Sequence, residues 1–163
     1  MKISCQRSLI ASAAVLAALA GCTGMNTSGP TAQAQVQARS GSQVNGTVSF
    51  TPRADGVVVE ARISGLTPGP HGFHVHEAGD CSAADASSAG GHFNPGAQAH
   101  GRAGHGAHLA GDTDNIVADA KGVARIDAHV SGVTLGGGAA NDIAGRAVIV
   151  HAAADDYTSQ PTG

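Results

Sequence analysis

The sequence predicts an all-β domain, a sandwich or barrel of short strands. Apolar and polar residues alternate in several short runs, each run ends in turn-forming residues, and no stretch has a convincing helical period. The chain has 163 residues, including 24 glycines. That length suits one domain with its own core plus a targeting segment, and the glycines favour many turns.

The strands are predicted from period-two alternation and from runs of β-branched residues. We expect them at 35–38, 44–50, 57–63, 71–76, 116–120, 123–130 and 147–150. The dipeptide Lys121–Gly122 predicts a tight hairpin turn between 116–120 and 123–130. The run 147–150 is apolar throughout, which is typical of a strand buried on both faces.

A long segment without strand pattern, Glu77 to Asp112, interrupts this series. It contains Gly, Ala, Ser and Pro, four histidines and Cys81. A loop of this length inside a compact domain is usually functional or disordered, and the histidines favour a functional loop.

The N-terminus has the features of a targeting signal. Lys2 and Arg7 precede the apolar run 9–20, which is too short for a permanent membrane span. The run ends Leu-Ala-Gly-Cys at Cys22, which resembles the lipobox of bacterial lipoproteins and implies cleavage before Cys22 and acylation of its thiol. The alternative is an ordinary signal with a chance cysteine. We predict a signal peptide at 1–21, a flexible tether at 22–34 and a β domain at 35–163.

Charge argues against one class of function. The formal net charge is −3, and no basic patch of the kind used to bind nucleic acid is evident. The unusual count is nine histidines. His74 and His76 flank Val75, so in a strand both imidazoles point to the same side. Imidazole suits copper and zinc, although a lone strand pair of histidines is more often structural or incidental.

Further motifs give the histidine pair a context. They are Gly72-Phe-His-Val-His-Glu77, Gly79-Asp-Cys81, His92-Phe-Asn-Pro95, Gly111-Asp112 and Gly145-Arg-Ala-Val-Ile-Val-His151. In this order and over residues 35–163, the chain resembles the copper-zinc superoxide dismutases. The resemblance implies a Greek-key β-sandwich or barrel, for which the family is a named example.

The resemblance also implies roles for single residues. The copper ligands it implies are His74, His76, His92 and His151. It makes His92 the bridge to zinc and the proton donor of the reaction. It gives zinc the further ligands His100 and Asp112, and it makes Asp155 the carboxylate that hydrogen-bonds a ligand histidine of each metal. His71, His105 and His129 receive no role and are expected to be exposed or capping.

The implied activity is dismutation of superoxide to O₂ and H₂O₂ at a histidine-bound copper, with zinc as a second cofactor. We expect a lipid-anchored enzyme that faces the periplasm and protects the cell envelope, and a homodimer is compatible with the family. The competing interpretation is a non-enzymatic, dismutase-like lipoprotein that binds copper.

The sequence departs from the family pattern at two places. Leu109 stands where the family has its third zinc histidine, and His108 lies one residue earlier. A one-residue shift reverses a side chain in a strand, whereas a loop bulge would still bring His108 to the zinc. The family's last strand, with an arginine beside copper and the cysteine that pairs with Cys81, has no counterpart in this sequence. The family disulfide is therefore not expected in the mature chain.

Overall fold

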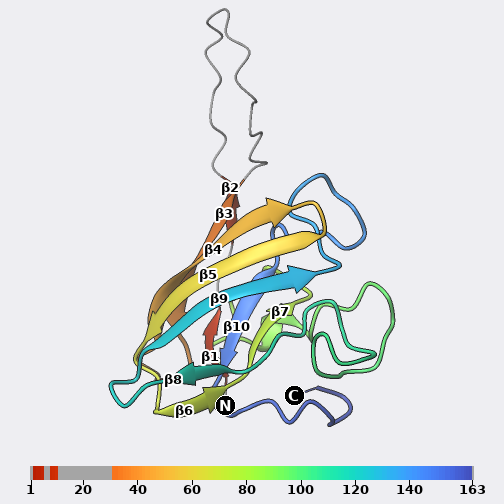
Figure 1. Cartoon of the computed structure of the whole chain (residues 1–163). Coiled ribbons are helices and arrows are strands. Elements are labelled where there is room, and N and C mark those ends of the chain that lie inside the picture. The colour runs from red at the N-terminus through yellow and green to blue at the C-terminus, as the bar shows by residue number, and fades with distance from the viewer. Residues whose placement is uncertain (1, 6–7, 11–30, 163) are drawn as a thin grey trace, which may run out of the picture.

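The computed structural model describes residues 2–5, 8–10 and 31–162, and these form antiparallel β structure with a single 3₁₀ turn (Figure 1). The strands are β1 (Lys2–Cys5), β2 (Ser8–Ile10), β3 (Ala32–Ala38), β4 (Asn45–Arg53), β5 (Gly56–Ser64), β6 (Gly69–His71), β7 (Phe73–His76), β8 (Ile116–Ala118), β9 (Ala124–Ser131) and β10 (Ala147–His151), and the 3₁₀ turn η1 is Ser87–Ala89. The prediction of an all-β fold is confirmed.

Most of the strands belong to one sheet. Its order is β7-β10-β1-β3-β4-β5-β9, with β2 also paired to β3, and β6 and β8 form a separate two-stranded sheet. Figure 1 shows β4, β5 and β9 side by side, with β9 passing in front of β10, so that two layers of strands enclose the interior. A hydrophobic core that includes Phe50, Val57 and Ile63 fills the space between them.

Strand β10 is buried on both faces, as the apolar run predicts. Val148 and Val150 belong to the main core. Ala147 and Ile149 face the opposite side and pack with Ala86 and Ala89 around η1, in the long loop. The loop is therefore part of the folded domain, and its packing on β10 fixes its position relative to the strand that carries His151.

The predicted strand 71–76 is divided in two. The amide N–H of Gly72 donates to Ala153 O at 2.9 Å, and the N–H of His151 donates to Gly72 O at 2.8 Å. Residues before Gly72 pair with β8, whereas residues after it pair with β10. The predicted strand is therefore divided at Gly72, because the residues on its two sides pair with strands of different sheets.

The predicted hairpin at Lys121–Gly122 is correct for its turn but not for its strands. The turn is present, with the N–H of Asp119 donating to Val123 O at 3.0 Å. The two strands then diverge, since β8 pairs with β6 and β9 pairs with β5. A local turn signal cannot report which partner each strand finds in the folded chain.

The N-terminal part adds two short strands. β1 lies between β10 and β3, with Ser4 opposite both Val150 and Ala38. β3 begins at Ala32, inside the predicted tether, because this segment pairs with β4 and with β2. Most of the predicted leader and tether, residues 11–30, lies outside the described residues.

None of the helical segments described has the length and apolar character to cross a membrane.

Candidate metal centre

Strand β7 places two histidines on the side facing away from the main core. Phe73 and Val75 are core residues, so the alternation of the strand turns His74 and His76 to the other face. In the pairing with β10, His74 lies opposite Ile149 and His76 opposite Ala147. The end of β10 supplies His151, so both strands bring imidazoles to one point.

The long loop supplies the fourth histidine. An isolated bridge joins His92 to His76, and the N–H of Phe93 donates to Val75 O at 2.8 Å. Gly111 closes the contact, because its N–H donates to Phe93 O and a Cβ there would lie 2.1 Å from Val75 O. Only glycine permits this approach of the loop to β7.

Four imidazoles consequently meet in one group. The ligand nitrogens of His74, His76, His92 and His151 all lie within 4.8 Å of one another. His74 and His92 have ring centroids 3.9 Å apart. The group is buried except at His151, which is half-buried.

The free nitrogens of this group are arranged to receive a cation. His76 Nδ1 is 2.9 Å from Gly90 O, which directs Nε2 inward to 3.3 Å from His151 Nε2. His74 Nδ1 and His92 Nε2 are buried and have no hydrogen-bond partner. Burial, and next the neighbouring imidazoles beginning with His92, lower the pKa of His74 far below its usual value. These inward-facing nitrogens fit copper, for which imidazole is a preferred ligand.

A second group adjoins the first through His92. His92 Nδ1 lies 2.7 Å from Asp112 Oδ1, and His100 Nδ1 lies 3.0 Å from Asp112 Oδ2. All three side chains are buried. Although burial opposes it, hydrogen bonds from His92 and from the Leu109 and Gly101 amides hold the pKa of Asp112 below its usual range. This is the group that would hold zinc, with three protein ligands.

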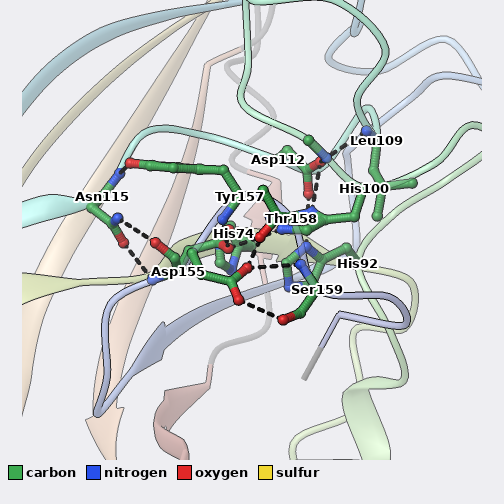
Figure 2. A network of polar contacts seen from close by, with 12 residues as sticks. His74, His92, His100, Leu109, Asp112, Asn115, Asp155, Tyr157, Thr158 and Ser159 are labelled. Atoms are coloured by element: carbon green, nitrogen blue, oxygen red, sulfur yellow. Dashed lines mark hydrogen bonds and ion pairs between the residues drawn. The ribbon is translucent and has the colours of Figure 1, made fainter.

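Asp155 connects the two groups (Figure 2). Its Oδ2 lies 2.9 Å from His74 Nε2, and its Oδ1 lies 2.9 Å from His100 Nε2. Asn115 holds it in place by donating to Asp155 O and accepting the Asp155 N–H. Although burial opposes it, Asp155 and then Asp112 raise the pKa of His100. The resemblance gives Asp155 this linking position, whereas Asn115, 40 residues earlier, carries no sequence signal.

The remaining predicted residues lie apart from the two groups. His108 is half-buried with Nδ1 at 2.8 Å from Gly106 O, and it is outside the three-residue group, while Leu109 is buried. Cys22 lies outside the described residues. Cys81 is disulfide-bonded in the whole chain, unlike the expectation for the mature chain, and its partner lies outside the residues whose side chains are described.

Two of the histidines left without a role are exposed, as expected, but His71 is not. His105 and His129 are exposed, and His129 lies 3.2 Å from Asp55. His71 is 1% exposed, with Nδ1 at 2.8 Å from His151 O and Nε2 at 2.8 Å from Thr67 O. His71 is therefore not exposed, because its ring is enclosed between the Thr67 carbonyl, four residues earlier, and the His151 carbonyl at the end of β10.

A cavity of about 230 Å³ gives access to the histidines. The group residues His74, His92, His100 and His151 form part of its wall. The described residues that line it include Asp155 and the exposed Asp156 but no lysine or arginine. The polar side chains of this wall are thus mainly histidines and two carboxylates.

Comparison with known proteins identifies the family of this arrangement. The model of the copper/zinc superoxide dismutase family matches residues 44–163. An extracellular Cu-Zn superoxide dismutase of Brugia pahangi is 44% identical over 113 residues, which cover 69% of this chain and 55% of that protein. Cu-Zn superoxide dismutase 2 of Mesembryanthemum crystallinum is 44% identical over 114 residues, covering 69% of this chain and 71% of that protein.

The solved structures include a similar fold. The crystal structure of the clock protein EA4 superposes with a TM-score of 0.71 at 38% identity, and the match covers 85% of this chain and 86% of that chain. Among the curated relatives, this chain spans only about half the length of the Brugia pahangi enzyme.

Proposed function

The chain belongs to the copper/zinc superoxide dismutase family, and from this premise we propose that it converts superoxide to dioxygen and hydrogen peroxide. In the balanced reaction, two superoxide anions and two protons give one O₂ and one H₂O₂. The observation that carries the proposal is the convergence of four imidazoles whose ligand nitrogens lie within 4.8 Å of one another. Two of these nitrogens, on His74 and His92, are buried without a hydrogen-bond partner.

The family's two metals divide between the two groups. His74, His76, His92 and His151 would hold copper, which when bound supplies a one-electron redox couple that takes an electron from one superoxide and gives it to another. His92, His100 and Asp112 would hold zinc, which has no redox chemistry.

The protein's own groups orient the imidazoles and handle protons. Gly90 O and Asp155 hold His76 and His74 with one nitrogen directed into the group. Because His92 Nδ1 is engaged with Asp112, its Nε2 is the atom at which we place the proton passed to the product, in a state in which Nε2 would not hold copper. The cavity gives the substrate its path from solvent.

Superoxide consumption by the copper-loaded full chain tests this function. We expect copper-dependent consumption well above that of free copper, lost in His76→Ala and kept in His105→Ala, whose histidine is exposed and outside both groups. Stoichiometric copper binding without consumption would reject the enzyme and support the non-enzymatic copper-binding lipoprotein.

The location is a further part of the proposal. We place the protein in the cell envelope, anchored by lipid on Cys22 and facing the periplasm, where it protects the envelope from superoxide. The charged start, the short apolar run and the small residues before Cys22 support this. Radiolabelled palmitate should enter the parent and not Cys22→Ser, and the variant should leave the membrane fraction. Equal labelling of both would contradict acylation at Cys22.

A further inference from the structure

The Asp112 carboxylate is in contact with four donors of the protein itself. Oδ1 accepts from His92 Nδ1 at 2.7 Å. Oδ2 accepts from His100 Nδ1 at 3.0 Å and from the backbone N–H groups of Gly101 at 3.2 Å and Leu109 at 2.9 Å. Asp112 is 1% exposed. Because charge-assisted hydrogen bonds in a buried place are strong, this carboxylate fixes both imidazoles.

The same place offers too few ligands for a closed zinc site. Within reach of one another, the described residues provide His92, His100 and Asp112 only. Structural zinc is almost always bound by four protein ligands in a tetrahedron. The fourth direction is not supplied by Leu109, whose side chain is apolar and buried and whose amide is already bonded to Asp112.

His108 does not fill the missing position. Its Nδ1 is 2.8 Å from Gly106 O, and its side chain lines a cavity of about 200 Å³ that Asp112, Asp114 and His129 of β9 also line. Although Asp112 reaches this cavity, the nitrogens of His108 are not among the ligand atoms that lie within reach of His92, His100 and Asp112. A change of loop conformation would be needed to bring His108 to the group.

From these contacts we propose that Asp112 holds His92 and His100 in place without a metal ion. Zinc then does not set the orientation of His92 toward copper, and the chain binds zinc more weakly than a four-ligand site would. When no zinc is bound, His92 acts as a terminal copper ligand backed by a carboxylate, the arrangement by which outer groups fix the tautomer and ring angle of a ligating histidine. The inference rests on the proposed function only in taking the four-histidine group as a copper site.

Zinc affinity tests the ligand count. Competition of the full chain with a chromophoric chelator should show zinc binding at least about ten-fold weaker in the parent than in Leu109→His. His108→Ala is the matched control and should bind zinc like the parent, because its ring lies outside the group. Equal affinity of parent and Leu109→His, or loss of zinc binding in His108→Ala, would overturn the proposal.

Electron paramagnetic resonance of bound Cu(II) tests the orientation independently of activity. Adding zinc at a concentration that just saturates Leu109→His should change the spectrum of that variant and leave the spectrum of the zinc-free parent unchanged. Asp112→Asn should alter the spectrum with zinc absent from both samples, which keeps the test valid if Leu109→His folds poorly. An unchanged Asp112→Asn spectrum, or a parent spectrum that needs zinc to sharpen, would reject the proposal. Both readouts are separate from superoxide consumption, so failure of the proposed activity and failure of this inference are distinguishable.

Discussion

His71 shows at the scale of a residue how a side chain without a sequence motif supports the metal group. Its ring lies between the carbonyls of Thr67 and His151, and the latter is 80 residues away. It therefore fixes the backbone at the end of β10, where a predicted copper ligand sits. His71 is 1% exposed, and a buried carbonyl that loses its hydrogen-bond donor destabilises the fold, so the N–H group of this ring contributes to stability.

Replacing His71 should reduce stability. His71→Phe keeps a ring but removes its N–H group, so one of the two buried carbonyls loses its donor and the free energy of unfolding should fall by about 1–3 kcal/mol. Urea unfolding of the metal-free chain measures this, with the exposed His105→Phe as control. A variant as stable as the parent would mean that water replaces the imidazole.

Asp156 sets the charge at the cavity entrance. The Ser159 hydroxyl, followed by the Ser159 and Thr158 amides, lowers the pKa of Asp156, so it is charged at neutral pH. Superoxide is an anion and the described lining carries no lysine or arginine. The Asp156 carboxylate therefore adds a repulsion to the approach of superoxide, and salt should screen that repulsion.

The rate of superoxide consumption should therefore rise with ionic strength. Between about 10 and 100 mM salt, where the Debye length falls from about 30 to about 10 Å, we expect an increase on the order of two-fold. Asp156→Asn should be faster at low salt and nearly independent of salt. Asp127→Asn, exposed on β9 and outside the cavity, should behave like the parent. A rate that falls with salt would disprove the repulsion.

At the scale of elements, the loop from β9 to β10 is organised by one carboxylate. Asp142 Oδ1 accepts the N–H groups of Gly136 and Ala144, and Oδ2 accepts that of Gly138, at 2.8–2.9 Å. Although burial opposes it, these amides, first that of Ala144, lower the pKa of Asp142. The carboxylate thus leads the chain into β10 and its histidine.

The lowered pKa of Asp142 makes the stability of the fold depend on pH in a defined direction. The pKa of Asp142 is lower folded than its unfolded value of about 3.9, so its contribution is complete well above pH 4 and is lost as pH falls through the folded pKa. Asp142→Asn should lower the unfolding free energy by about 1–3 kcal/mol at pH 7. The gap between parent and variant, measured by urea unfolding without metal, should narrow below about pH 4. A gap independent of pH would contradict this assignment.

The strands show which features of secondary structure a local sequence pattern can predict. Alternation locates β4, β5 and β9 within a few residues, because one face of each is buried and the period of two is preserved. The break at Gly72 and the divergence of β8 and β9 were not predictable in this way. Both depend on hydrogen bonds to strands elsewhere in the chain.

At the scale of the whole molecule, β1 joins two parts of the large sheet. It pairs with β10 on one side and with β3 on the other. The proposed processing before Cys22 would remove this strand together with β2. Both neighbours would then present unpaired backbone groups, which is the usual liability of an exposed sheet edge.

Deleting residues 1–10 should therefore loosen β10 and β3. By hydrogen exchange, the amides of these strands that face β1 should exchange at least about ten-fold faster than in the full chain, since each loses its partner. Amides of β5, which stays between β4 and β9, serve as the internal control. Unchanged protection in β10 and β3 would mean that β1 does not hold the sheet together.

The sequence alone determined the fold class, the family and a list of histidines and carboxylates, because strand period and motif spacing are local properties of the chain. Only the tertiary structure decided which of these residues meet. Four imidazoles from β7, the long loop and β10 converge, Asp112 and Asp155 join them, and His108 stays outside. The exact direction of a loop side chain depends on contacts made across the fold. His108 is an example, because its ring lies against Gly106 O while the amide of the next residue, Leu109, is bonded to the buried Asp112.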